Sequence, residues 1–98
     1  MSDLRLDQLP DGRPIRIEKN GTPICVARVN NQVFAVSDIC SHSEASLSEG
    51  DISDFKIECW LHGAEFDLQT GKAMSLPATE SIETYSVIVD GNSVTIEI

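Results

Sequence analysis

Apolar residues recur at every second position along most of this chain, and this spacing constrains the fold more than any other feature. In the segment 64–69, Ala64, Phe66 and Leu68 alternate with charged or amide side chains. Successive side chains of a β-strand point to opposite faces, so a period of two is typical of a strand with one buried face. The sequence therefore predicts an all-β fold.

Turn-forming residues divide this pattern into hairpins, because Asn-Gly and Asp-Gly tolerate the positive φ that tight turns require. The first third of the chain is predicted to be a three-stranded meander, and a last hairpin is predicted to close the sheet. In chain order, the expected strands and turns are Ile15–Lys19, Asn20-Gly21, Thr22–Val29, Asn30-Asn31, Gln32–Ser37, then Ser86–Val89, Asp90-Gly91-Asn92 and Val94–Ile98.

The length of 98 residues allows one compact domain and is too short for two independent cores, so residues 1–98 are expected to form a single domain. Residues 40–54 are polar and lack either regular period, which predicts an ordered loop. Loops this long inside a compact domain are usually functional. In the next alternating segment, residues 55–60, Cys59 is expected on the inward face of a strand.

The chain is acidic, with a formal net charge of −9 from sixteen acidic and seven basic residues. This charge disfavours binding to nucleic acid or to anionic membranes. No basic segment followed by an apolar run opens the sequence, and no eighteen apolar residues occur together, so a cytoplasmic protein is expected. Three cysteines in a reducing compartment indicate metal binding rather than a disulfide framework.

Four candidate metal ligands fall into two short clusters. Cys40 and His42 form a C-x-H cluster, Cys59 and His62 form a C-x-x-H cluster, and sixteen residues separate the two. Each cluster supplies one thiolate and one imidazole, and four such ligands satisfy the two irons of a 2Fe-2S centre, with two His in place of two Cys. The same four side chains are also a sufficient tetrahedral set for a structural zinc ion.

The segments Cys40-Ser41-His42 and Cys59-Trp60-Leu61-His62-Gly63 resemble the Rieske motif. Phe66-Asp67, Thr70-Gly71, Leu76-Pro77 and Asp90-Gly91 extend the resemblance over nearly the whole chain, to the small ferredoxins that serve aromatic-ring dioxygenases. This resemblance implies an antiparallel β-sandwich with a cluster-binding subdomain inserted at about residues 39–80. It also implies that Leu76-Pro77-Ala78 covers the cluster as a third loop.

The resemblance implies that the chain is an electron carrier and not an enzyme. It would pass single electrons from a flavin-dependent ferredoxin reductase to a terminal ring-hydroxylating oxygenase. Both histidines are used by the cluster, which leaves none for a mononuclear iron site, and the six glycines form no dinucleotide fingerprint. The alternatives are an accessory Rieske subunit of another redox complex, of nitrite-reductase or iron-sulfur-assembly type, or the zinc module.

Acidic residues near the ligand segments are expected to steer a basic partner into a transient complex. They are Glu44, Glu49, Asp51 and Asp54.

Four positions differ from those of high-potential Rieske proteins. Ala45 and Leu61 stand where those proteins have a disulfide, and Ala64 and Phe66 stand where they have hydroxyl donors to the cluster region. A midpoint potential of about −150 mV, at the low end of the Rieske range, is therefore expected.

Further residues have expected roles outside the ligand set. Cys25 lies in an apolar segment and is expected to be a core residue. Trp60 and Leu61 are expected to shield the cluster from water, with Leu47 a weaker candidate, and Gly63 is expected to allow close backbone approach.

Overall fold

A computed structural model of the chain describes residues 3–30, 32–39, 46–60, 63–74 and 81–97. In these residues it contains strands and two short 3₁₀ helices, which confirms the predicted all-β class. The elements are β1 (Leu4–Arg5), η1 (Leu6–Gln8), β2 (Pro14–Lys19), β3 (Thr22–Val29), β4 (Gln32–Ser37), η2 (Leu47–Glu49), β5 (Asp51–Ser53), β6 (Lys56–Glu58), β7 (Glu65–Asp67), β8 (Thr84–Asp90) and β9 (Ser93–Glu97). No helix among these residues has the length and apolar character needed to cross a membrane.

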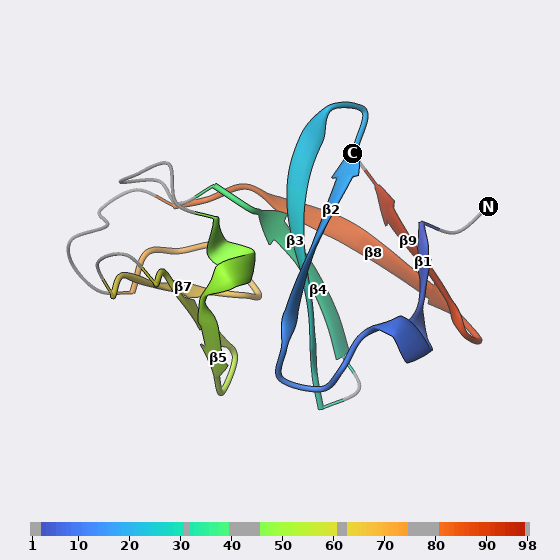
Figure 1. Cartoon of the computed structure of the whole chain (residues 1–98), viewed down its shortest axis with the longest axis horizontal. Helices are drawn as coiled ribbons and strands as arrows, with labels where there is room; N and C mark the ends of the chain where they lie inside the picture. The colour runs from blue at the N-terminus through green and yellow to red at the C-terminus, as the bar shows by residue number, and fades with distance from the viewer. Residues whose placement is uncertain (1–2, 31, 40–45, 61–62, 75–80, 98) are drawn as a thin grey trace.

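The larger sheet has the antiparallel order β1-β9-β8-β4-β3-β2. The strand β8 joins its two halves, because Thr84 and Tyr85 pair with β4 while Ser86 to Asp90 pair with β9 (Figure 1). The two edges of the sheet also approach each other. Lys19, at the end of β2, donates hydrogen bonds to the Asp3 carboxylate and to the Ile96 carbonyl of β9. These contacts connect the end of β2 to β9 and to the residue before β1.

A smaller antiparallel sheet, with the order β5-β6-β7, lies beside the larger one (Figure 1). Ile52, Ile57 and Phe66 occupy one rung across its three strands. Ile57 and Phe66 are fully buried, and Phe34 of β4 meets Phe55 edge to face with ring centroids 5.9 Å apart. The small sheet therefore packs against the large one through an apolar layer.

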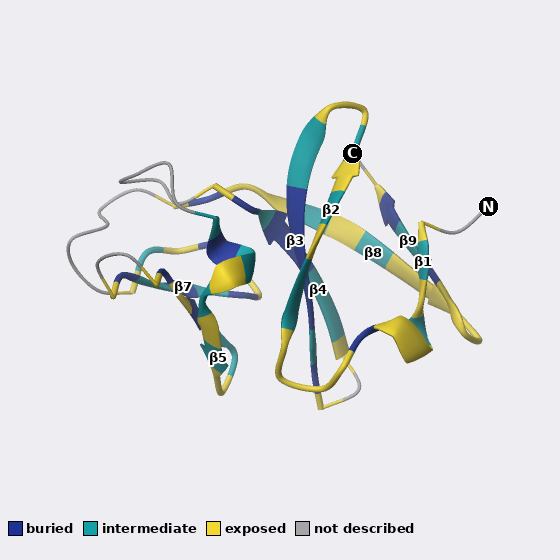
Figure 2. Cartoon of the chain, viewed as in Figure 1, coloured by how far each residue is buried: buried dark blue, intermediate teal, exposed yellow. Residues whose placement is uncertain are grey.

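The strand β3 is the wall between two cores, because its alternate residues face opposite ways. Ile24 and Val26 are buried with Val94 and Ile96 inside the sandwich. The residues Cys25, Ala27 and Val29 are buried in the second core, which the small sheet completes. Figure 2 shows the buried colour along much of β3. The prediction that Cys25 is a core residue is confirmed.

The predicted hairpins are confirmed with small changes of boundary. Asn20 and Gly21 have φ values of 54° and 79°, as a tight hairpin turn requires, and Val89 pairs with Val94 across the last turn. The prediction that 40–54 is one loop without regular structure was wrong in its described part. The segment from residue 46 onward forms η2 and β5, which are too short and polar to produce a recognisable period. The predicted Leu76-Pro77-Ala78 crossing lies outside the described residues.

Candidate metal centre

Cys59 lies directly after β6, at the end of the central strand of the small sheet, and its side chain is fully buried. It shares the second core with Ile57 and Ala64. Its backbone N–H donates to the Ala64 carbonyl over 2.6 Å, and its carbonyl accepts from the Gly63 N–H over 2.9 Å. A thiol donor is thus held at the base of a tight turn, on the inward face that the sequence predicted.

The first predicted ligand segment is closed in the same way. Ile39 and Ser46 form an antiparallel bridge, and the Leu47 N–H donates to the Asp38 carbonyl over 2.6 Å. Ile39 and Ser46, the residues on either side of the segment 40–45, are therefore adjacent in space. The residues that flank each predicted ligand segment are thus hydrogen-bonded to one another, as expected at the bases of the two loops of a metal site.

The returning limb of the first loop lies against the strand that carries Cys59. Asp51 pairs with Glu58, the residue before Cys59, and a Cβ added at Gly50 would lie 1.8 Å from the Glu58 carbonyl oxygen. Only glycine allows the backbone to approach this closely. The base of the first loop and the base of the second are thereby fixed side by side, although they are distant in sequence.

A third segment begins and ends near the same sheet. Phe66 forms a bridge with Ala73, the Met74 N–H donates to the Glu65 carbonyl over 2.7 Å, and the Ile82 N–H donates to the Gly71 carbonyl over 2.8 Å. Gly71 has a φ of 76°, and a Cβ there would lie 2.2 Å from the Ile82 carbonyl oxygen. The two ends of the segment 75–80 are therefore anchored beside the strand β7.

The other three predicted ligands, Cys40, His42 and His62, lie outside the described residues. Within the part that is described, no three Cys, His, Asp or Glu side chains gather closely enough to hold a metal ion. What the structure does supply is a buried sulfur donor between two closed loop bases. These features fit a cluster held by one thiolate and one imidazole from each loop.

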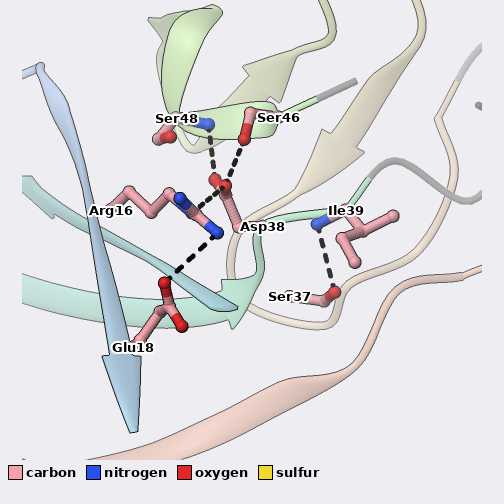
Figure 3. Close-up of polar contacts among 7 residues, drawn as sticks. All are labelled: Arg16, Glu18, Ser37, Asp38, Ile39, Ser46 and Ser48. Carbon is pink, nitrogen blue, oxygen red and sulfur yellow. Dashed lines mark hydrogen bonds and ion pairs between the residues drawn. The ribbon is translucent and has the colours of Figure 1, made fainter. Parts of the chain in front are cut away.

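The base of the first loop contains a buried carboxylate that the sequence did not identify. Asp38 is 1% exposed, and Arg16 of β2 approaches it with 3.2 Å between Nε and Oδ2 (Figure 3). The pKa of the Cys25 thiol is raised well above its ordinary value, chiefly by burial and secondly by the Asp38 charge. Cys25 is therefore a thiol of the apolar core, as the sequence predicted. An acidic residue at the end of an apolar strand was the available signal for Asp38.

The side chains expected around the cluster differ in exposure. Trp60 is 52% exposed, while Leu47, Ala64 and Phe66 are buried in the second core. Gly63 has a φ of 75°, which glycine adopts without strain, and nothing lies within 4 Å of a Cβ built there. The expected shielding by Trp60 and close approach at Gly63 both stay predictions.

Comparison with known proteins identifies the class to which this fold and site belong. The model of the Rieske [2Fe-2S] domain matches residues 2–86. The chain belongs to the Rieske [2Fe-2S] domain family, and the predicted 2Fe-2S cofactor is confirmed.

The relatives are specific within that family. The chain is 48% identical over 90 residues to the 3-phenylpropionate/cinnamic acid dioxygenase ferredoxin subunit of Photorhabdus laumondii, covering 89% of this chain and 84% of the relative. It is 40% identical over 90 residues to the ferredoxin component of biphenyl 2,3-dioxygenase from Rhodococcus jostii, covering 92% and 84%. These relatives are electron-transfer components, so the predictions of a dioxygenase-type ferredoxin and of a non-enzyme are confirmed.

Solved structures agree with the predicted Rieske-like sandwich. The ferredoxin of carbazole 1,9a-dioxygenase from Nocardioides aromaticivorans superposes with a TM-score of 0.94 at 36% identity, covering 98% of this chain and 94% of that one. A nitrite reductase small subunit also superposes, with a TM-score of 0.87 at 21% identity over 100% of this chain and 97% of that one. At that identity the likeness extends to the fold alone.

Proposed function

We propose that this chain is a one-electron carrier whose 2Fe-2S cluster is held by Cys40, His42, Cys59 and His62. The observation that carries the ligand set is the position of Cys59, a buried thiol at a closed loop base beside the base of the other ligand loop. The cluster supplies a site that accepts and releases a single electron. We further propose one domain over residues 1–98, with the cluster-binding subdomain at about 39–80.

The chain's own residues hold the ligands and exclude water behind them. In the described core next to Cys59, Ile57, Ala64 and Phe66 are fully buried and carry no hydroxyl group. An apolar environment with few hydrogen-bond donors stabilises the extra negative charge of the reduced state less than a polar one does. This supports a midpoint potential of about −150 mV, toward the low end of the Rieske range.

The proposed partners are a flavin-dependent ferredoxin reductase and a terminal ring-hydroxylating oxygenase. A relative at 33% identity, with a TM-score of 0.93, is solved as a complex of reduced oxygenase and oxidized ferredoxin in carbazole 1,9a-dioxygenase. In this chain Glu49, Asp51 and Asp54 are exposed near the loop bases, while Glu44 lies outside the described residues. The carboxylates would steer a basic partner, so electron transfer should slow as salt increases. The proposed compartment is the cytoplasm.

The ligand set is tested by substitution with a matched control. Replacing His42 or His62 with alanine, or Cys40 or Cys59 with serine, should abolish the visible absorbance and the EPR signal of the reduced cluster. The third cysteine supplies the control, because Cys25 is a buried core residue of β3 that is not one of the four proposed ligands, and Cys25→Ala should keep both signals. A normal spectrum in any of the four ligand variants would refute that ligand.

The carrier role is tested by reconstitution with a dioxygenase and its reductase. Substrate hydroxylation coupled to NADH oxidation should require this chain and should fall with rising ionic strength. Hydroxylation that proceeds equally well without the chain would refute the proposed function.

A further inference from the structure

Asp38 is the only charged side chain that is buried within the described part of the chain. Asp38 directly follows β4, which stops at Ser37, and the predicted ligand Cys40 comes two residues after Asp38. Burying a carboxylate is costly unless it is paired and hydrogen-bonded. The contacts of Asp38 therefore show which parts of the chain its buried charge connects.

Three hydrogen bonds connect Asp38 to the far side of the first loop, and Figure 3 shows the two that its carboxylate accepts. The Ser46 hydroxyl donates to Oδ2, the Ser48 N–H donates to Oδ1 over 2.8 Å, and the Leu47 N–H donates to the backbone carbonyl over 2.6 Å. One residue thus binds three consecutive residues of the returning limb. The two ends of the loop that carries Cys40 and His42 cannot separate while these bonds persist.

Arg16 connects this closed base to the larger sheet. Its Nε lies 3.2 Å from Asp38 Oδ2, and its NH2 group lies 3.6 Å from the Glu18 carboxylate on the same strand. The Asp38 N–H also donates to the Pro23 carbonyl of β3 over 3.2 Å. The base of the loop is therefore fixed in orientation as well as closed, relative to strands on a different sheet from Cys59.

We propose that Asp38 and Arg16 form a clamp that positions the first ligand loop, and so control how firmly the cluster is retained and what potential it has. Asp38 is a positioning residue in this proposal, acting through Cys40 and His42. The inference rests on the ligand set proposed above. The Asp38 carboxylate is buried while Arg16 is half exposed, and the contacts of the carboxylate compensate the cost of burying its charge.

The test uses holoprotein and four variants. Asp38→Asn removes the buried charge, Arg16→Met removes its partner, and Arg16→Lys restores the positive charge without the planar guanidinium. Arg16 is 51% exposed, so its replacement leaves the core intact. Arg5→Met is the matched control, because it removes the same charge from an exposed ion pair with Asp7.

Cluster loss is followed by visible absorbance after addition of an iron chelator. We expect Asp38→Asn and Arg16→Met to lose the cluster roughly tenfold faster than wild type, the size of effect expected when a charge-assisted hydrogen bond is broken. Arg16→Lys should recover part of the loss, and Arg5→Met should match wild type. Asp38→Asn should also shift the EPR g-values and raise the midpoint potential, because it removes a negative charge near the reduced cluster.

The outcomes separate this proposal from the one on which it rests. If wild type lacks a Rieske-type spectrum, the ligand set is wrong and the clamp proposal falls with it. If wild type has the spectrum and both clamp variants show wild-type loss rates and g-values, the clamp proposal alone is overturned. A lower melting temperature with unchanged loss rate and spectrum also overturns it, since that is the signature of a merely structural ion pair. If Asp38→Asn does not fold, Arg16→Met decides.

Discussion

Replacing Phe66 with alanine should destabilise the protein more than any exposed substitution, because its ring fills the core between β3 and the small sheet. The ring is fully buried. The backbone of Phe66 pairs with Ile57 on one side and bridges to Ala73 on the other. Truncating a buried phenylalanine costs about 3–5 kcal/mol from lost transfer free energy and the cavity that is left. The total free energy of unfolding of a single domain is only about 5–15 kcal/mol.

The assay is a thermal melt of the holoprotein at fixed scan rate, followed by far-UV circular dichroism and by visible absorbance. For a domain of this size, each 1 kcal/mol lowers the midpoint by roughly 4–8 °C, so Phe66→Ala should melt at least about 12 °C below wild type. Because Cys59 and Ala64 belong to the same core, absorbance and dichroism should be lost in one transition.

Two controls bound this expectation. Val89 is 46% exposed, and Val89→Ala should shift the midpoint by less than about 4 °C. Phe66→Leu refills most of the volume and should fall between the two. A Phe66→Ala midpoint within about 4 °C of wild type would refute the idea that the small sheet and β3 share one close-packed core.

Other single groups give three further expectations. Asp3→Asn should lower the free energy of unfolding in urea by about 1–2 kcal/mol at neutral pH. The hydrogen bond from the Ile96 N–H is the main cause that lowers the Asp3 pKa from 3.8. The stability difference between wild type and variant is therefore complete above that value and disappears as the pH falls through the folded-state pKa. A difference that persists at about pH 2 would contradict the role of the ionised Asp3 carboxylate as acceptor of the Ile96 N–H. Gly71→Ala should lower the free energy of unfolding by well over the approximately 1 kcal/mol expected for Gly12→Ala. Both glycines have positive φ, but only at Gly71 would the added Cβ meet a carbonyl oxygen, at 2.2 Å. Equal losses in the same titration would be evidence against the close approach. Cys25 should stay unmodified by iodoacetamide at pH 8 in the folded protein and react in urea, since burial raises its pKa; mass spectrometry showing rapid modification of the folded chain would contradict its burial.

Local sequence signals were sufficient for the hairpins of the larger sheet, but not for its edge strand β1. Asn20-Gly21 specifies its turn through two positive φ values, and the strand period of two assigns alternate residues of β3 to opposite cores. Cys59 was placed correctly on an inward face for the same reason, because the alternation with Ile57 continues through it. These are properties of neighbouring residues, which a linear sequence displays directly.

Tertiary contacts were not visible in the sequence. The polar residues of η2 and β5 have no period, and they are held by contacts such as the close approach of Gly50 to Glu58. Asp38 reads as an ordinary loop aspartate, and its burial depends on Arg16, which is 22 positions earlier in the chain. All four predicted ligands were found by their spacing and their resemblance to a known motif, and as ligands all four stay predictions.

The claim that two imidazoles and two thiolates hold the cluster is tested most directly by pulsed EPR of the reduced protein grown with ¹⁵N-histidine. The chain has only two histidines, so every labelled imidazole is a proposed ligand. The account predicts strong ¹⁵N couplings from two inequivalent histidine nitrogens. A reduced cluster without histidine coupling, or with coupling to a single imidazole, would contradict it.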